Sequence, residues 1–287
     1  MQRIMFSSLP LPASGFRLLC AMIIAVSCIA CSTPAQRYNK QAATLGLTMQ
    51  VVQTDHFAHA VFDNGVVAGE RLFILIEGDG TPWVGNIPAA DPTPRRPLMT
   101  ALAAKMSAPA YVLGRPCYHA IDPIARCQND HWTYARYSEQ VVASLAQVVG
   151  SLSQAWESAE LVLVGHSGGG TLAYLVAAQL SNVDAIITLA ANLDVPAWTR
   201  YHGYEALVDS MNPTTAPKPP AAVTQIHYIG ANDSVVPPHT RAAFFAAHPQ
   251  AKEVLLQDFG HYCCWLEAWP ELLNRALVSE SAATQRR

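Results

Sequence analysis

A serine set between glycines is the feature of the sequence with the clearest chemical meaning. The stretch ELVLVGHSGGGTLAYLVAAQ, residues 160–179, places Ser167 between Gly165 and Gly169. Apolar residues precede this G-x-S-x-G pattern, and an apolar run with helical period follows it. A serine on a sharp turn between a strand and a helix has unfavourable backbone angles, so its neighbours must be small. Such a turn exposes the hydroxyl for nucleophilic attack.

Short apolar runs alternate with helical patterns along the chain and supply the elements on either side of this turn. The runs predicted to be strands buried on both faces are residues 71–78, 110–114, 160–167, 184–191, 223–230 and 252–260. The clearest helix is residues 138–156, with Ser138 as its N-cap. This alternation predicts a mostly parallel sheet covered by helices on both sides. Two earlier runs, 47–54 and 59–65, predict an antiparallel hairpin at its edge.

The strand LVLV, the turn GHSGG and the helix GGTLAYLVAAQL together resemble the nucleophile elbow of the α/β-hydrolases. The resemblance covers about residues 70–275 and implies an α/β-hydrolase three-layer sandwich with a mostly parallel central sheet and a small cap. It implies Ser167 as the nucleophile and the backbone N–H of Gly168 as an oxyanion donor. Residues 192–220 are the interval for the cap, where Trp198, Tyr201, Tyr204 and Met211 could line an acyl pocket or pack the cap onto the body.

The same resemblance implies an acid and then a histidine later in the chain. His261, in LLQDFGHYCCW, follows the last predicted strand and is the expected base. Asp233, in HYIGANDSVVPPH, follows the penultimate predicted strand and is preferred as the acid, although a helix cap is its alternative role. Asp194 is the alternative acid, one strand earlier. The side chain of His166, the variable residue of the elbow, is expected to point away from the chemistry.

The loop EGDG after the first buried strand stands where the family has its second oxyanion donor. By that resemblance the donor is the backbone N–H of Asp79, with Gly80 or Thr81 as alternatives and a plain tight turn as the other interpretation. An Asp79 carboxylate that faced the pocket would disfavour an anionic substrate group. Two long connections, 91–104 and 114–138, contain Arg95, Arg96, Arg115 and Trp132, for which substrate contact and surface cover are equally expected.

The predicted activity is hydrolysis of small or medium carboxylic esters or thioesters through an acyl-serine, with no cofactor. An acyltransferase with the same triad and a catalytically idle ligand-binding lipoprotein are the alternatives. The motif DHFAH at residues 55–59 is poor support for a metal site, because its histidines fall on the predicted edge hairpin. The partners expected are therefore a small-molecule ester or acyl substrate and, through the N-terminus, a membrane.

The N-terminal segment has the pattern of an export signal. Arg3 and Arg17 precede an apolar run of about thirteen residues, LLCAMIIAVSCIA, which is too short to span a bilayer comfortably. The following Cys31 resembles the lipidated cysteine of bacterial lipoproteins, with Cys28 as a second candidate. An ordinary signal peptide or a retained anchor is the alternative.

This pattern divides the chain into a lipoprotein-type signal peptide at 1–30, a flexible tether at 31–47 and a hydrolase domain at 48–287. The lipid would anchor the protein in a membrane so that it faces the periplasm, and Ser32 favours the outer membrane under the sorting rule that the lipoprotein resemblance implies.

Export makes disulfides stable, and four cysteines lie in the predicted domain. Cys117 and Cys127 bracket a proline-containing loop, and a bridge between them is favoured over free thiols. Cys263 and Cys264 are adjacent, so they could form a vicinal disulfide or pack as small apolar side chains, and packing is favoured.

Composition limits the function classes. The chain has 287 residues, of which 51% are hydrophobic, and it shows no internal repeat, which favours one domain with a large core. Its net charge is −3 and its few basic residues are scattered, so nucleic acid is not an expected partner.

Overall fold

The computed structural model describes residues 32–121, 126–156 and 159–284. The chain divides into two compact units, Met1–Thr33 and Pro34–Arg287, and every element below belongs to the second. The predicted signal peptide and the lipidation site at Cys31 lie outside the described residues. Within the described residues, no helix is both long and apolar enough to cross a membrane.

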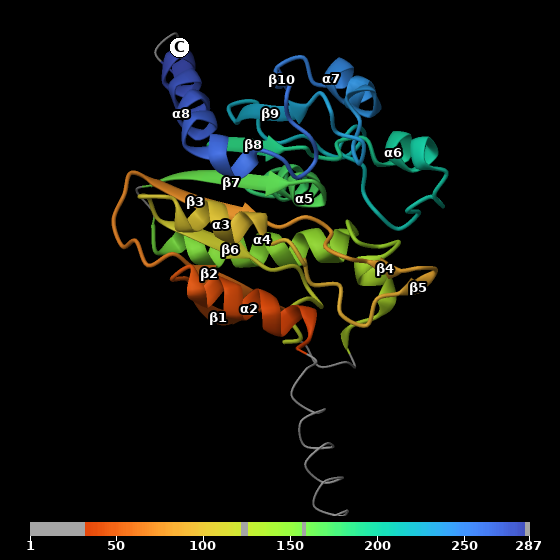
Figure 1. The fold of residues 1–287 in the computed structure, drawn as a ribbon. Helices are drawn as coiled ribbons and strands as arrows, with labels where there is room; N and C mark the ends of the chain where they lie inside the picture. Colours follow the sequence, from red (N-terminus) through yellow and green to blue (C-terminus); the bar gives the residue numbers. More distant parts are fainter. Residues whose placement is uncertain (1–31, 122–125, 157–158, 285–287) are drawn as a thin grey trace, which may run out of the picture. The chain divides into compact units, whose positions relative to one another are not determined.

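An eight-stranded sheet forms the centre of this unit, in the order β1-β2-β6-β3-β7-β8-β9-β10 (Figure 1). The strands are β1 Thr48–Gln53, β2 Ala58–Asp63, β3 Arg71–Ile76, β6 Ala110–Leu113, β7 Glu160–His166, β8 Ala185–Leu189, β9 Thr224–Gly230 and β10 Lys252–Leu256. The pairings β1–β2 and β2–β6 are antiparallel, whereas the others are parallel. The mostly parallel sheet and its antiparallel edge hairpin are therefore confirmed.

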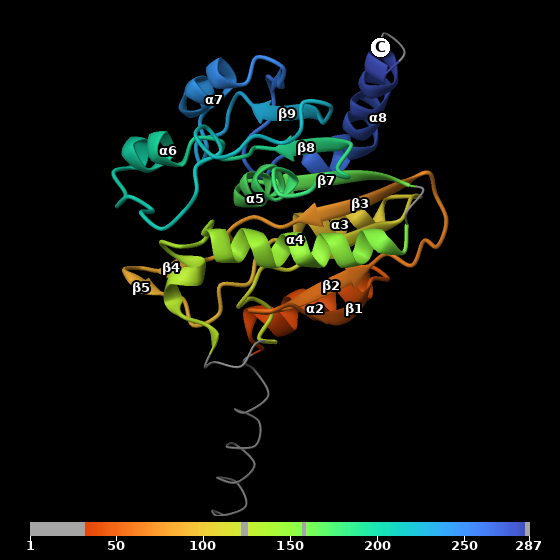
Figure 2. The same ribbon diagram turned by 180° about the vertical axis from the view of Figure 1, so that it is seen from behind.

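Helices cover both faces of the sheet, because the buried strands are apolar on both faces. Along β3, Leu72, Ile74 and Ile76 pack into the same cluster as helices α4 (Glu139–Gln154) and α5 (Gly168–Ala177). The alternating residues Phe73 and Leu75 pack into the cluster of α3 (Leu98–Ala104) and α8 (Trp265–Thr284). Figure 2 shows α4 and α5 in front of the sheet. The result is the predicted three-layer sandwich.

Helix α2, Pro34–Thr44, occupies most of the stretch where a flexible tether is expected. Ala35, Tyr38 and Ala42 are buried, and their spacing of three and four residues places them on one helical face. The Tyr38 hydroxyl donates to the carboxylate of Glu77 at 3.0 Å, and the Ala35 N–H donates to Asp91 at 2.9 Å. Residues 34–44 are therefore a docked helix, and the expectation of a tether is wrong for them.

Smaller elements lie at the carboxyl ends of the parallel strands. β4 (Trp83–Val84) and β5 (Ile87–Pro88) form a short hairpin after β3, and α6 (Val195–His202) follows β8. The 3₁₀ helices η2 (Asn129–Trp132) and η3 (Pro238–Arg241) and the helix α7 (Ala242–Ala247) complete the described elements. Between β8 and β9, α6 is the one helix of the described chain, so the cap is small, as predicted.

Two disulfides join cysteines of the described chain. Cys117 is bonded to Cys127 with a Cα–Cα distance of 5.5 Å, as the sequence predicts. Cys263 is bonded to Cys264, although the sequence favours packing for this pair. The packing expectation is wrong because Cys263 is exposed in the turn before α8, and the neighbouring Trp265 fills the core instead.

Candidate active site

Ser167 lies on a strained turn between β7 and α5, with φ of 55° and ψ of −125°. Positive φ is costly for a residue with a side chain and persists only where the surrounding structure enforces it. A Cβ on Gly165 would lie 2.3 Å from the carbonyl oxygen of Gly169, and one on Gly169 would lie 2.1 Å from that of Ile76. The glycines of the G-x-S-x-G pattern are therefore required by close backbone contacts.

Ser167, His261 and Asp233 form one hydrogen-bonded line, although 66 and 94 positions separate the serine from the acid and from the histidine in the chain. His261 Nε2 lies 3.0 Å from Ser167 Oγ, and His261 Nδ1 lies 2.9 Å from Asp233 Oδ2. Because an ionised carboxylate only accepts, Nδ1–H donates to Asp233 and Nε2 is left to accept from the serine hydroxyl. The three loops that follow β7, β9 and β10 bring these residues together.

The carboxylate of Asp233 is held by its own loop. Its Oδ1 accepts from the N–H groups of Val235 and Val236, each at 2.8 Å, and its side chain is fully buried. Arg241 Nη2 lies 4.0 Å from Oδ2. These contacts fix the second oxygen toward His261. Asp194, the alternative acid, instead caps α6 by accepting from the N–H of Ala197 at 3.1 Å.

The backbone around the elbow presents two free donors. Gly168 is the first residue of α5, and among the described residues no backbone acceptor takes its N–H or that of Asp79. The carbonyl oxygen of Asp79 accepts from the Tyr118 hydroxyl at 2.8 Å, which holds the loop in place. A Cβ on Gly78 would lie 3.3 Å from Ser167 Cβ, so this loop runs directly beside the serine.

Two arginines and a tyrosine surround the side chain of Asp79. Of these three residues, the sequence singles out Arg115 alone. The Asp79 carboxylate accepts from Arg115 Nη1, from Arg136 Nη1 at 3.1 Å and from the Tyr137 hydroxyl at 2.7 Å. Burial alone would raise the pKa of Asp79, but the two guanidinium groups outweigh it and lower the pKa to about 2. The long connection 114–138 predicts a binding loop. No local sequence pattern distinguishes Arg136 or Tyr137 from the other residues of that loop.

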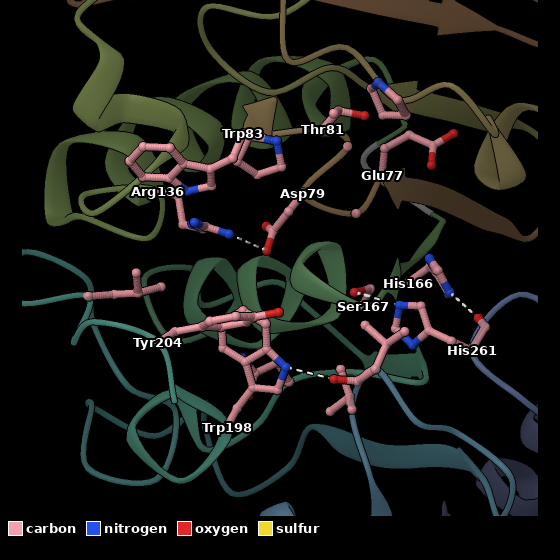
Figure 3. Close-up of a pocket in the computed structure, with 18 of the residues that line it drawn as sticks. Glu77, Asp79, Thr81, Trp83, Arg136, His166, Ser167, Trp198, Tyr204 and His261 are labelled. Carbon is pink, nitrogen blue, oxygen red and sulfur yellow. Dashed lines mark hydrogen bonds and ion pairs between the residues drawn. The ribbon is translucent and has the colours of Figure 1, made fainter. Parts of the chain in front are cut away.

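His166 contradicts the expectation that its side chain points away from the chemistry. Its Nε2 lies 2.8 Å from the carbonyl oxygen of His261, and the two rings are 4.9 Å apart (Figure 3). Burial, together with the neighbouring His261, lowers the pKa of His166 to about 3, so it is neutral and Nε2–H donates. The expectation fails because the loop after β10 folds over the elbow and places this carbonyl beside the ring.

A cavity of about 990 Å³ opens beside Ser167 and His261. Trp83, Tyr134, Trp198 and Tyr204 line it, and Arg95, Arg96 and Arg136 also border it. Figure 3 shows Trp83 and Arg136 on one side of the cavity and Trp198 and Tyr204 on another.

The other predicted lining residues take different positions. Tyr201, Met211 and Trp132 are not among the described lining residues, and Trp132 is buried. Within the described residues, no group of three or more His, Cys, Asp or Glu side chains could hold a metal ion. Glu77, Asn86, Asn192 and Glu205 also border the cavity, so its polar lining extends beyond the elbow, the Asp79 cluster and the two exposed arginines.

Comparisons with known proteins bear on the family and the fold of the chain. The family model described as "Serine hydrolase (FSH1)" matches residues 113–264, which include Ser167, Asp233 and His261. No curated protein matches the chain significantly.

Solved structures share the fold at low sequence identity. An esterase from Pyrococcus furiosus is 14% identical, with 83% of this chain and 92% of that chain covered and a TM-score of 0.55. An α/β serine hydrolase without a lid from Xanthomonas campestris is 14% identical, with coverage of 81% and 94% and a TM-score of 0.53. A membrane phospholipase A, described as a bacterial virulence factor, is 15% identical, with coverage of 93% and 99% and a TM-score of 0.55.

Proposed function

Because the chain belongs to the FSH1 serine hydrolase family, we propose that it cleaves carboxylic esters or thioesters through an acyl-serine on Ser167. The observation that carries this proposal is the continuous line of hydrogen-bonding distances, 3.0 Å from Ser167 to His261 and 2.9 Å from His261 to Asp233. Order in the chain and the strained elbow support the same assignment. The reaction needs no cofactor.

In the acylation step, Ser167 Oγ attacks the carbonyl carbon while His261 Nε2 takes its proton. Asp233 stabilises the imidazolium through Nδ1–H. The negative charge that develops on the carbonyl oxygen is stabilised by the free N–H groups of Gly168 and Asp79. The tetrahedral intermediate then collapses, and the imidazolium gives its proton to the departing alkoxide or thiolate. The products of this step are the alcohol or thiol and the acyl-serine.

Deacylation uses the same groups in reverse. His261 Nε2 takes a proton from water, and the oxygen of that water attacks the acyl carbon. Collapse of the second intermediate returns the proton to Ser167 Oγ and releases the carboxylic acid. An alcohol or amine in place of water would give acyl transfer, so analysis of products formed with water and with alcohol acceptors separates hydrolase from transferase.

Labelling and kinetics test the nucleophile. We expect a fluorophosphonate to label the protein at Ser167 and p-nitrophenyl esters to be hydrolysed. Ser167→Ala and His261→Ala are expected to lower kcat by about 10³ or more, because members of a triad act as a unit. Full esterase activity in an equally folded Ser167→Ala protein contradicts the proposal.

The acid is tested by a matched pair of variants. Asp233→Asn is expected to lower kcat by about 10³–10⁴, because the amide cannot hold the imidazole in the required tautomer. Asp194→Asn is expected to be mild, because asparagine caps a helix about as well as aspartate. A severe effect of Asp194→Asn with an active Asp233→Asn protein would reassign the acid.

The location is a separate proposal that the N-terminal sequence supports. The mature protein begins at Cys31, carries lipid there and faces the periplasm from the outer membrane. Mass spectrometry of the purified protein tests this, because lipidation adds fatty acyl groups to an N-terminal cysteine. An unmodified N-terminus at another residue contradicts it.

A further inference from the structure

The cluster around Asp79 carries a net positive charge beside the elbow. Two guanidinium groups, Arg115 and Arg136, face a single carboxylate, and the side chains of the two arginines are 1% and 6% exposed. Because Asp79 is ionised, the three groups sum to +1 in a nearly buried setting. A buried charge without a partner is costly, so this excess calls for water or an anion.

The excess charge faces the cavity through Arg136. Its Nε donates to the Thr133 carbonyl at 2.6 Å and its Nη1 to Asp79, while no described residue accepts from its Nη2. Arg136 is only 5% exposed as a whole, yet it borders the cavity that holds Ser167. Figure 3 shows its guanidinium directed toward Asp79 from the side of Trp83. Arg136 therefore keeps an unused donor at the cavity wall.

The Asp79 carboxylate lies between the unused donor of Arg136 and Gly168, the residue after the nucleophile. A Cβ on Gly168 would lie 2.0 Å from Asp79 Oδ1, so the carboxylate touches the residue that follows the serine. The other carboxylate oxygen is bonded to Arg136. One carboxylate group thus separates Arg136 from Gly168, and a substrate whose carbonyl lies at the elbow would reach Arg136 with a short extension.

The remaining charged groups of the cavity do not cancel this excess. Arg95 and Arg96 are exposed at the cavity and form no ion pair in the described chain, and the guanidinium of Arg96 lies 5.1 Å from the ring centroid of Tyr262. Two acidic residues also border the cavity. Glu205 accepts from the Tyr134 hydroxyl at 2.6 Å, and Glu77 accepts from the Tyr38 hydroxyl.

We infer that the substrates of this site carry an anionic group, a carboxylate or a phosphate, a few bonds from the scissile ester, and that Arg136 binds it with Arg95 and Arg96 contributing at the mouth. This inference rests on the proposed hydrolase function and names its substrate class. It reverses the sequence-based expectation that Asp79 disfavours anions, because Arg115 and Arg136 more than offset its charge.

Two pairs of matched esters test the inference on the full-length protein. Mono(4-nitrophenyl) adipate and 4-nitrophenyl hexanoate have the same leaving group and six-carbon acyl chain, but only the first has a terminal carboxylate. 4-Carboxyphenyl hexanoate and its methyl ester place the charge in the leaving group instead. We expect kcat/KM to favour the anionic member of at least one pair by about tenfold, the discrimination typical of one charge-assisted hydrogen bond.

Variants assign this preference to Arg136. Arg136→Gln is expected to remove the preference, and Arg136→Lys to keep part of it. Arg200→Gln is the matched control, because it removes the same charge from an exposed position on α6 that does not border the cavity. The ratio of the two kcat/KM values is expected to be unchanged in this control.

If Arg136→Gln fails to fold, the double variant with Arg95→Gln and Arg96→Gln at the exposed positions provides a second test. This double variant is expected to lower the ratio by about threefold, since exposed charges contribute weakly. If the wild-type protein hydrolyses the neutral esters without preferring either anionic one, or if the preference survives Arg136→Gln, the inference is overturned and the hydrolase proposal stands. If no ester is hydrolysed, the hydrolase proposal itself fails.

Discussion

Replacement of Glu77 by glutamine is expected to make the protein more stable at alkaline pH. Glu77 is 2% exposed, and its Oε1 accepts from the Tyr38 hydroxyl and from the Met99 N–H, each at 3.0 Å. Burial raises its pKa from 4.5 to about 7, although the hydrogen bonds act in the opposite direction. Between pH 4.5 and 7, the folded protein therefore holds a proton on Glu77 that the unfolded chain has already released.

The sign and size of the effect follow from this difference. Between pH 4.5 and 7 the folded state binds more protons than the unfolded state, so the free energy of unfolding falls as pH rises. A pKa difference of about 2.5 corresponds to roughly 3 kcal/mol. Glutamine never ionises and still offers Oε1 to both donors. Glu77→Gln is therefore expected to match the wild type near pH 4.5 and to exceed it by up to roughly 3 kcal/mol at pH 8.

Urea unfolding followed by tryptophan fluorescence at pH 4.5, 6 and 8 measures this difference. Glu70→Gln is the control, because Glu70 is exposed and a surface substitution of this kind is usually within about 0.5 kcal/mol of the wild type. A stability difference between Glu77→Gln and the wild type that does not change with pH, or a less stable variant at pH 8, would refute the reasoning.

Three further predictions concern backbone contacts and the long disulfide. Gly168→Ala is expected to lower kcat by about 10² or more, because its Cβ would collide with the Asp79 carboxylate, and esterase assays measure this. Gly150→Ala, on α4 with nothing within 4 Å of the added Cβ, is expected to raise the free energy of unfolding by about 0.5–1 kcal/mol with unchanged activity. In protein made in an oxidising compartment, Cys117 and Cys127 are expected to resist alkylation without reductant. Replacing both by serine is expected to lower the free energy of unfolding by about 2–3 kcal/mol in urea titrations.

Local patterns were sufficient to predict the elbow and the strands. Ser167 sits between a run apolar on both faces and a helical run, and both signals lie within twenty residues of sequence. The six apolar runs all form strands of the sheet, because a sheet covered on both sides buries runs that are apolar on both faces. The α/β-hydrolase resemblance implies the chain order that predicts Asp233 and His261, and their contact depends on the parallel order of β7, β8, β9 and β10.

Features that depend on contacts between residues far apart in the chain could not be predicted from the sequence. The polar composition of residues 34–44 conceals a helix that is docked by a few side chains, Tyr38 foremost among them. The charge state of the Asp79 environment depends on Arg115 and Arg136, which a long connection brings back to the loop. His166 is turned toward His261 by a carbonyl 95 positions away.

If Cys31 carries the proposed lipid, the docked helix α2 leaves only a short connection between that lipid and the catalytic unit. The Ala35 N–H donates a hydrogen bond to the Asp91 carboxylate, and residues 94–96 of the same loop border the cavity. Only four peptide units join Cys31 to Ala35, a reach of at most about 14 Å when fully extended. An acylated Cys31 would therefore confine the search for substrate to a thin layer along the bilayer, where local concentration instead of diffusion from bulk water decides which esters are encountered.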